Sequence, residues 1–280
     1  MSGLISADHL QTRLGSPGLV ILDTRSGPGG AGLASFEAAH IPGARHTDYA
    51  ADGWRARVGQ VPGMLPDAGH LAALFARLGL ERGQQIVIVP AGLSVSELAG
   101  AARIYWTLKV CGFNPAGMLD GGMAGWLAEG RPLAQGPVTV APAGVPALSV
   151  DPALRADAAA TLTALEASQT LLDARAASYF AGLEKAPEAR VAGHIPGAVQ
   201  VDYSHTYDAL RQRLRPRADL EALFAGVGEG PVVTYCNTGH TAALNWFVLS
   251  EVLGRPAVRL YDGSMTDWTQ DPARPVSTLT

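Results

Sequence analysis

The sequence predicts an α/β protein made of two tandem copies of one domain, each a parallel sheet flanked by helices. Two observations predict this fold class. Short apolar segments, such as Gln85–Val89 and Pro231–Tyr235, alternate with helical segments, as they do when helices cover both faces of a parallel sheet. Several short motifs also occur twice in the same order, and Asp173 lies 150 residues after its counterpart Asp23. We therefore interpret the chain as an internal duplication.

The repeated motifs are specific enough to align the two copies. They are an Asp-x-Arg strand end, a His-Ile-Pro-Gly-Ala turn and an Asp-Gly-x-Met-x-x-Trp turn, found at 23–25 and 173–175, at 40–44 and 194–198, and at 120–126 and 262–268. A chain of 280 residues is long enough for two domains. We expect a first domain over 1–136, a Pro/Gly-rich linker over 137–149 and a second domain over 150–280.

Three helices can be placed within this frame. We expect Ala158–Ala167 to be helical with Asp157 as its N-cap, because an aspartate before an apolar segment is a common helix start. A second helix is expected over Ala242–Leu253, ended by Gly254. The corresponding helix of the first copy is expected over Leu98–Cys111.

Composition limits the possible partners. Hydrophobic residues make up 48% of the chain, charged residues make up 16%, and the net charge is −4 without a long run of either sign. We therefore expect no nucleic acid and no membrane as partner. No apolar stretch approaches the ~20 residues of a membrane helix, and Met1–Leu10 lacks the features of a signal peptide. Two cysteines without a Cys-x-x-Cys pattern indicate a reducing compartment, so we expect a cytoplasmic protein without a bound metal.

The segment that carries chemistry is Cys236-Asn237-Thr238-Gly239-His240-Thr241. A cysteine ends a strand, a loop containing glycine follows, and a helix begins. Ligands of parallel sheets bind at the carboxyl ends of the strands, which is where this cysteine lies. The N–H groups of such a loop, with the positive end of the following helix, favour the thiolate, which is the nucleophilic form of cysteine.

Each cysteine also has a purely structural interpretation, because free cysteines are often buried as small apolar side chains. For Cys236 the strand-end position favours a functional role. For Cys111, at the end of an expected helix, packing is favoured. The duplication supports this distinction, because Pro90 aligns with Cys236 and the first copy has no thiol in its loop. We also expect the first loop, Pro90–Glu97, to be longer, and we expect the first domain to be inactive.

The repeat also indicates structural roles for other residues that could have been catalytic. His40 and His194 occur in both copies, so we expect them to fix turns by hydrogen bonds. The pairs Asp23/Arg25 and Asp173/Arg175 are expected to be structural ion pairs. Arg175 has a second possible role in substrate binding, because its strand ends at the same edge as the strand of Cys236.

With these features the chain resembles the two-domain rhodanese family of sulfurtransferases. The resemblance covers nearly the whole chain and rests on the doubled motifs, on Met64-Leu65-Pro66 and on the loop that Cys236 opens. It implies two rhodanese-like domains, of which only the second is catalytic. It also implies that Cys236 carries the transferred sulfur as a persulfide, cradled by the amides of Asn237, Thr238, Gly239, His240 and Thr241.

The reaction implied is a double displacement. The partners would be a small anionic sulfur donor such as thiosulfate and an acceptor, cyanide or a thiol; no cofactor is implied. Two alternatives within sulfur chemistry stay open: 3-mercaptopyruvate as the donor, and a persulfide relay module without small-molecule turnover. A phosphatase of similar fold is disfavoured, because its loop closes with an arginine that clamps oxyanions, and here Ala242 follows Thr241.

The donor is predicted from loop residues. Neutral Asn237 and Thr238 resemble the loop of mercaptopyruvate enzymes, whereas His240 is polar and can carry a positive charge. The loop as a whole is similar to bacterial proteins classed as thiosulfate sulfurtransferases. We therefore expect thiosulfate to be the better donor, with a protonated His240 stabilising the leaving sulfite. A His240 that merely packs is the alternative.

Overall fold

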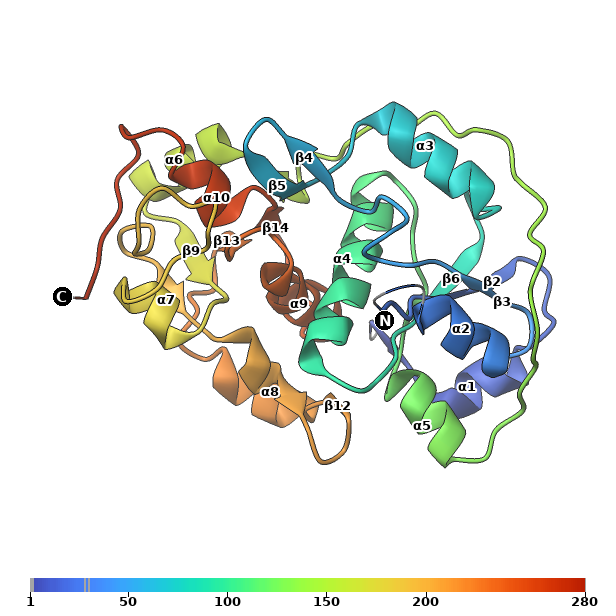
Figure 1. Ribbon diagram of the computed structural model, residues 1–280. Coiled ribbons are helices and arrows are strands. Elements are labelled where there is room, and N and C mark those ends of the chain that lie inside the picture. Colours follow the sequence, from blue (N-terminus) through green and yellow to red (C-terminus); the bar gives the residue numbers. More distant parts are fainter. Residues whose placement is uncertain (1–2, 28, 30, 280) are drawn as a thin grey trace. The chain divides into compact units, whose positions relative to one another are not determined.

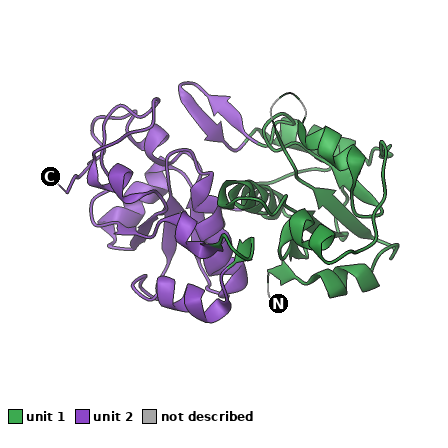
Figure 2. Ribbon diagram, turned by 60° about the horizontal axis from the view of Figure 1, so that its bottom comes forward, with its two compact units in different colours: residues 1–54, 66–150, 208–214 green, residues 55–65, 151–207, 215–280 purple. Residues whose placement is uncertain are grey.

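The computed structural model describes residues 3–27, 29 and 31–279 (Figure 1). The chain divides into two compact units, shown in different colours in Figure 2. Unit 1 contains residues 1–54, 66–150 and 208–214, and unit 2 contains residues 55–65, 151–207 and 215–280. Within the described ranges, no helix combines the length and apolar character needed to cross a bilayer.

The units are not continuous in sequence, because each includes one segment from the other half of the chain. Residues 55–65, which form a hairpin early in the sequence, belong to unit 2, whereas residues 208–214 belong to unit 1. The division by sequence at 136 and 150 does not take these two segments into account. As a division into separately folding domains it stays a prediction.

The elements alternate between strands and helices, as the sequence indicated. In the first half they are β1 (Leu4–Ile5), α1 (Ala7–Thr12), β2 (Leu19–Asp23), α2 (Ala31–Ala38), β3 (Ala44–His46), β4 (Ala56–Val58), β5 (Val61–Met64), α3 (Ala68–Arg77), β6 (Gln85–Val89), α4 (Val95–Val110), β7 (Gly117–Leu119) and α5 (Gly122–Ala128). In the second half they are β8 (Arg155–Ala156), α6 (Ala158–Glu166), β9 (Thr170–Asp173), α7 (Ala177–Ala181), β10 (Val199–Gln200), η2 (Tyr203–Thr206), β11 (Tyr207–Asp208), β12 (Arg213–Leu214), α8 (Arg217–Leu223), β13 (Val232–Tyr235), α9 (Thr241–Phe247), η3 (Val248–Val252), β14 (Val258–Tyr261) and α10 (Ser264–Trp268).

The two five-stranded sheets have the same topology, which confirms the predicted fold class. Unit 1 has the strand order β1-β7-β6-β2-β3, and unit 2 has the order β8-β14-β13-β9-β10 when read in the matching direction. Every neighbouring pair is parallel. Because the equivalent strands occupy equivalent places, β13 of unit 2 corresponds to β6 of unit 1.

Both faces of β13 in the unit 2 sheet are covered by other elements. Alternate residues of the strand point to opposite sides of the sheet. Val233 and Tyr235 lie in one apolar cluster with Leu171 and with Trp268 of α10. The hydroxyl of Thr234, between them, donates to the Ala242 carbonyl of α9 at 3.3 Å. The central strand is therefore buried throughout, and its end presents the next residue at the edge of the sheet.

Two details of the helices differ from the sequence-based expectation. Helix α4 begins at Val95, three residues earlier than expected, because Ser94 caps it by accepting from the Glu97 amide. The first loop therefore runs from Pro90 to Ser94, as long as the loop from Cys236 to His240. The expectation of a longer first loop is wrong. The predicted helix at 242–253 is α9, which begins at Thr241 and continues into the π-helical turn η3.

The recurring histidines hold turns in both units, as predicted. The His40 ring donates from Nδ1 to the Phe36 carbonyl at 2.8 Å and stacks on the Phe36 ring. The His194 ring makes the same bond to the Phe180 carbonyl at 2.7 Å and stacks on that ring. Because both imidazoles are held in this way, they serve the scaffold.

Candidate active site

Cys236 is the first residue after β13 and is buried, with 2% of its surface exposed. The register pairs Tyr235 with Asp173 of β9, so the residues that follow both strands meet at one edge of the sheet. The sequence predicted this juxtaposition of the cysteine with the Asp-x-Arg strand end. Cys111, by contrast, caps the end of α4 at 1% exposure, in agreement with a packing role.

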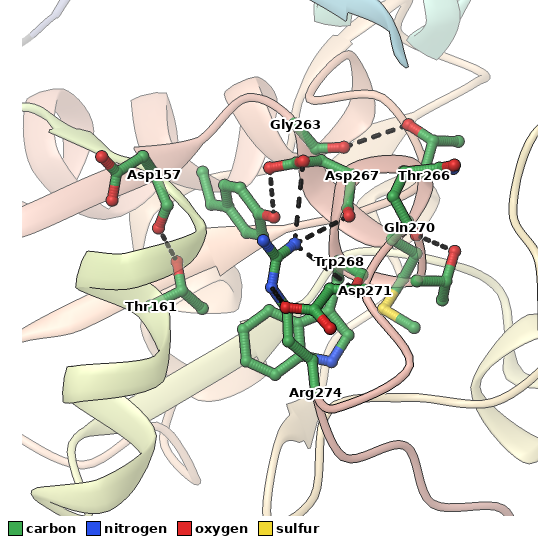
Figure 3. Close-up of polar contacts among 12 residues, drawn as sticks. Asp157, Thr161, Gly263, Thr266, Asp267, Trp268, Gln270, Asp271 and Arg274 are labelled. Carbon is green, nitrogen blue, oxygen red and sulfur yellow. Dashed lines mark hydrogen bonds and ion pairs between the residues drawn. The ribbon is translucent and has the colours of Figure 1, made fainter. Parts of the chain in front are cut away.

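Helix α10 fixes the start of the cysteine loop through two carbonyl groups. The Met265 amide donates to the Cys236 carbonyl, and the Thr266 amide donates to the Asn237 carbonyl, both at 3.1 Å. The Thr266 hydroxyl lies 2.9 Å from the same Asn237 oxygen and 3.0 Å from the Gly263 carbonyl, the second contact being drawn in Figure 3. The carbonyls of the first two loop residues therefore point to α10.

The Ser264 hydroxyl closes the loop. Its oxygen accepts from the Cys236 amide at 3.0 Å and from the Gly239 amide at 3.1 Å. It donates in turn to the Tyr261 carbonyl at 2.8 Å. The amide of Gly239, one of the groups expected to cradle a persulfide, thus already has an acceptor in this structure.

Arg175 forms a buried ion pair and also reaches the loop. Its Nε and Nη2 atoms bind Asp173 at 2.9 Å and 2.6 Å, and Nη2 also donates to the Gly193 carbonyl. Its Nη1 atom lies 3.4 Å from Oδ1 of Asn237. The aligned Arg25 of unit 1 makes the same ion pair, but its Nη1 donates to the Ser35 carbonyl at 3.0 Å. One arm of the guanidinium is thus turned to the loop only in the unit with the thiol.

Burial and nearby charges shift the pKa values of two residues near the cysteine, Arg175 and Tyr203. Burial alone would lower the pKa of Arg175, but the hydrogen bond and the charge of Asp173, with smaller contributions from Tyr235 and Cys236, raise it. Burial raises the pKa of Tyr203, and the charges of Asp202 and Cys236 add to the effect. The sulfur therefore lies within electrostatic range of a permanent cation and of a neutral phenol.

The hairpin of β4 and β5 contributes to the same site, although it comes from the first half of the sequence. A Cβ atom on Gly63 would lie 2.6 Å from the Thr238 carbonyl oxygen, so only glycine allows this approach at its φ of +80°. The Leu65 amide donates to Oδ2 of Asp262 at 2.7 Å. Asp262 is fully buried and pairs with Arg155 at 2.8 Å.

The remaining loop residues are placed as follows. Asn237, Thr238, His240 and Thr241 are half-buried, His240 lies at the N-cap position of α9, and Thr241 is its first residue. The structure brings all of them together with Cys236 and Arg175. Their roles in binding a persulfide stay predictions. In the described part of the chain, no group of three or more His, Cys, Asp or Glu side chains could hold a metal ion.

Three features that lie at the site of Cys236 were not predicted from the sequence. Tyr203 had no signal that separated it from scaffold, because Asp-Tyr occurs in both copies, and Met64-Leu65-Pro66 marked the end of the hairpin at 55–65 without indicating its contact with the cysteine loop. Ser264 did have a signal: it replaces Gly122 in the Asp-Gly-x-Met-x-x-Trp motif of the copy that carries the cysteine.

Comparison with known proteins places both halves of the chain in the same family. The model of the rhodanese-like domain matches residues 6–129 and 157–271. A probable 3-mercaptopyruvate sulfurtransferase of Pseudomonas aeruginosa is 36% identical over 98% of this chain and 98% of its own length. A thiosulfate sulfurtransferase of Azotobacter vinelandii is 35% identical over 98% of this chain and 96% of its own length.

Solved structures agree with this placement. The chain is similar to the Escherichia coli protein SseA, described as a 3-mercaptopyruvate sulfotransferase with the rhodanese fold, at a TM-score of 0.79 and 27% identity. The match covers 94% of this chain and 99% of that chain.

Proposed function

Because this chain belongs to the rhodanese family and is a sulfurtransferase, we propose that it moves the sulfane sulfur of thiosulfate to cyanide or a thiol through a persulfide on Cys236. The observation that carries the proposal is the arrangement around this cysteine. It lies at the carboxyl end of β13, in a loop that α10 holds, beside the cationic arm of Arg175. A strand-end thiolate next to a fixed cation suits an anionic sulfur donor.

In the proposed reaction, the Cys236 thiolate attacks the outer sulfur of thiosulfate. The sulfur–sulfur bond of thiosulfate breaks, and sulfite leaves with the bonding electrons. Cyanide then attacks the outer sulfur of the persulfide, thiocyanate leaves, and the thiolate is restored. Each half-reaction is a nucleophilic displacement, so ping-pong kinetics are expected.

Two cations are proposed to favour thiosulfate over 3-mercaptopyruvate. Arg175 carries a permanent positive charge, and its Nη1 atom lies 3.4 Å from the Asn237 side chain. His240 adds a second positive charge when protonated, next to the developing charge on sulfite. On this proposal, the activity declines above neutral pH as His240 loses its proton. Relatives named for either donor match the chain about equally well, at 36% and 35% identity.

The first experiment tests the nucleophile. The protein is incubated with thiosulfate or 3-mercaptopyruvate and analysed by mass spectrometry, with Cys236→Ser and the matched Cys111→Ser variant. We expect one added sulfur on Cys236, none in Cys236→Ser, and normal loading and turnover in Cys111→Ser. Loss of loading in the Cys111 variant would show that the site is assigned wrongly.

The second experiment tests the donor. We expect kcat/KM with cyanide to be higher for thiosulfate than for 3-mercaptopyruvate, and we expect His240→Gln to lose the decline of activity above neutral pH. A wild-type preference for 3-mercaptopyruvate would overturn the proposed donor. A pH profile that is the same in His240→Gln would exclude the histidine from the mechanism. Persulfide formation without turnover by any small acceptor would favour the relay module.

A further inference from the structure

Position 264 is one of three that differ between two motifs with the same pair of amide-to-carbonyl bonds to their loops; Thr266, in place of Ala124, also brings a hydroxyl to the Asn237 carbonyl in unit 2. In unit 1 the amides of Met123 and Ala124 donate to the carbonyls of Pro90 and Ala91 at 2.8 and 2.9 Å. In unit 2 the corresponding amides, after Ser264, donate to the first two carbonyls of the cysteine loop. The carbonyl bonds thus belong to the shared scaffold and occur with or without a thiol.

The third residue of each motif, Gly122 or Ser264, adopts a left-handed backbone conformation. The φ angle of Gly122 is +57° and that of Ser264 is +52°. Glycine adopts this conformation readily, whereas a residue with a Cβ atom is strained by it. In unit 1, a Cβ atom on Gly122 would also lie 2.4 Å from the Pro90 carbonyl oxygen. Unit 2 therefore has a strained residue where the same scaffold elsewhere uses glycine.

The strain at Ser264 is offset by what its hydroxyl binds. The side chain is fully buried, and its oxygen receives the amides of Cys236 and Gly239 and donates to the Tyr261 carbonyl. One atom thus joins the end of β14 to the first and fourth residues of the loop. Unit 1 has no hydroxyl at the equivalent place, since glycine has no side chain.

The helix that carries Ser264 is itself held firmly. The Tyr261 hydroxyl donates to Oδ2 of Asp267 at 2.6 Å. Arg274 donates to the Asp267 carbonyl at 2.8 Å and lies over the Trp268 ring, as Figure 3 shows. Ser264 is therefore mounted on a fixed support, so its bonds can impose a shape on the loop instead of following it.

We propose that Ser264 is a positioning residue for sulfur transfer, which sets the curvature of the Cys236 loop through the amides of Cys236 and Gly239. The inference rests on the proposed role of Cys236 as the sulfur carrier. Once two loop amides are bound by Ser264 and two loop carbonyls by α10, the cysteine is held in one backbone geometry. A small displacement of a nucleophile can slow a reaction about 10²-fold, so this restraint bears directly on the rate.

The test compares Ser264→Gly and Ser264→Ala in the full chain. Both remove the hydroxyl, but glycine also relieves the strain at φ +52° and copies the residue that unit 1 uses. Thr161→Ala is the control, because Thr161 is fully buried and its hydroxyl donates only to the Asp157 carbonyl of α6, outside the site (Figure 3). The measurements are the single-turnover rate of persulfide formation with thiosulfate, the melting temperature, and hydrogen exchange of the amides at 236 and 239.

We expect both Ser264 variants to load sulfur about 10²-fold more slowly, with faster exchange at the two amides. Ser264→Gly should nevertheless melt at a higher temperature than Ser264→Ala, so that rate does not follow stability. Thr161→Ala should melt earlier and load at the wild-type rate.

Loading by Ser264→Gly within threefold of wild type, or unchanged exchange at both amides, would overturn the inference. The same holds if the rates of the two Ser264 variants follow their melting temperatures. A wild-type protein that takes up no sulfur would instead refute the proposed function and the inference with it.

Discussion

Replacing Arg175 by lysine, with Arg25→Lys as the matched control, would separate scaffold from chemistry at the Asp-x-Arg strand end. Both arginines form a two-bond ion pair with a fully buried aspartate, and their side chains are only 4% and 11% exposed. The substitution keeps the charge in both units. Only at position 175 does it also remove a group that approaches the cysteine loop.

The expected loss of stability follows from the geometry. Removing one partner of a buried ion pair destabilises a protein by about 3–5 kcal/mol. Lysine retains the attraction between the charges but loses the planar fork, so we expect a loss of about 1–3 kcal/mol in either variant. Because the two pairs are alike, the two losses should be similar.

The expected effect on catalysis differs between the variants. A hydrogen bond to a charged group contributes about 1.5–3 kcal/mol, which corresponds to roughly 10- to 100-fold in rate. We therefore expect Arg175→Lys to lower kcat/KM for thiosulfate by about that factor, while Arg25→Lys stays near the wild-type value. Denaturant unfolding and steady-state kinetics, measured where both variants are folded, provide the two quantities. Equal losses of kcat/KM in both variants would mean that Arg175 acts only through the scaffold.

Three further predictions concern the hairpin at 55–65 and one carboxylate. A fragment of residues 150–280 lacks this hairpin, so it should accept sulfur on Cys236 but turn over about 10-fold more slowly or worse; full turnover would contradict this. Gly63→Ala should lower both the melting temperature and kcat, because its Cβ atom would lie 2.6 Å from the Thr238 carbonyl oxygen, and unchanged values would refute the close approach. Burial raises the pKa of Asp120 above its ordinary value of 3.8, against the opposing charge of Arg213. The folded state then binds this proton more tightly than the unfolded state, so the contribution of Asp120 to stability falls as the pH rises from that value. Asp120→Asn should make the unfolding midpoint depend less on pH as the pH rises from 3.8. Identical pH profiles of the two proteins would contradict the raised pKa of Asp120.

Features that repeat within the sequence could be predicted well. The strand ends, the turns of His40 and His194 and the position of Cys236 follow from local motifs, and the duplication separated the features shared by both copies from those found only in the second. The start of α4 was misplaced although a signal existed, because Ser94 and Glu97 form a capping pair three residues apart.

Other features of the site could not be predicted, because they depend on contacts between distant segments. The bond from Leu65 to Asp262 joins residues 197 apart in the sequence, and no local pattern announces it. The replacement of Gly122 by Ser264 is visible in the sequence, but the three hydrogen bonds of the buried Ser264 hydroxyl are not. The effect of the Cys236 charge on the pKa of Tyr203 likewise depends on two segments that are distant in the sequence.

The membership of residues 55–65 in unit 2 has a consequence for synthesis of the chain. At about 5–20 residues per second, Leu65 leaves the ribosome roughly 10–40 s before Asp262, to which it binds. Until Asp262 has been synthesised the bond between these two residues cannot form, and unit 2 also needs residues 55–65 from the first half of the chain. The copy whose loop has no thiol thereby supplies residues 55–65 to the unit that contains Cys236.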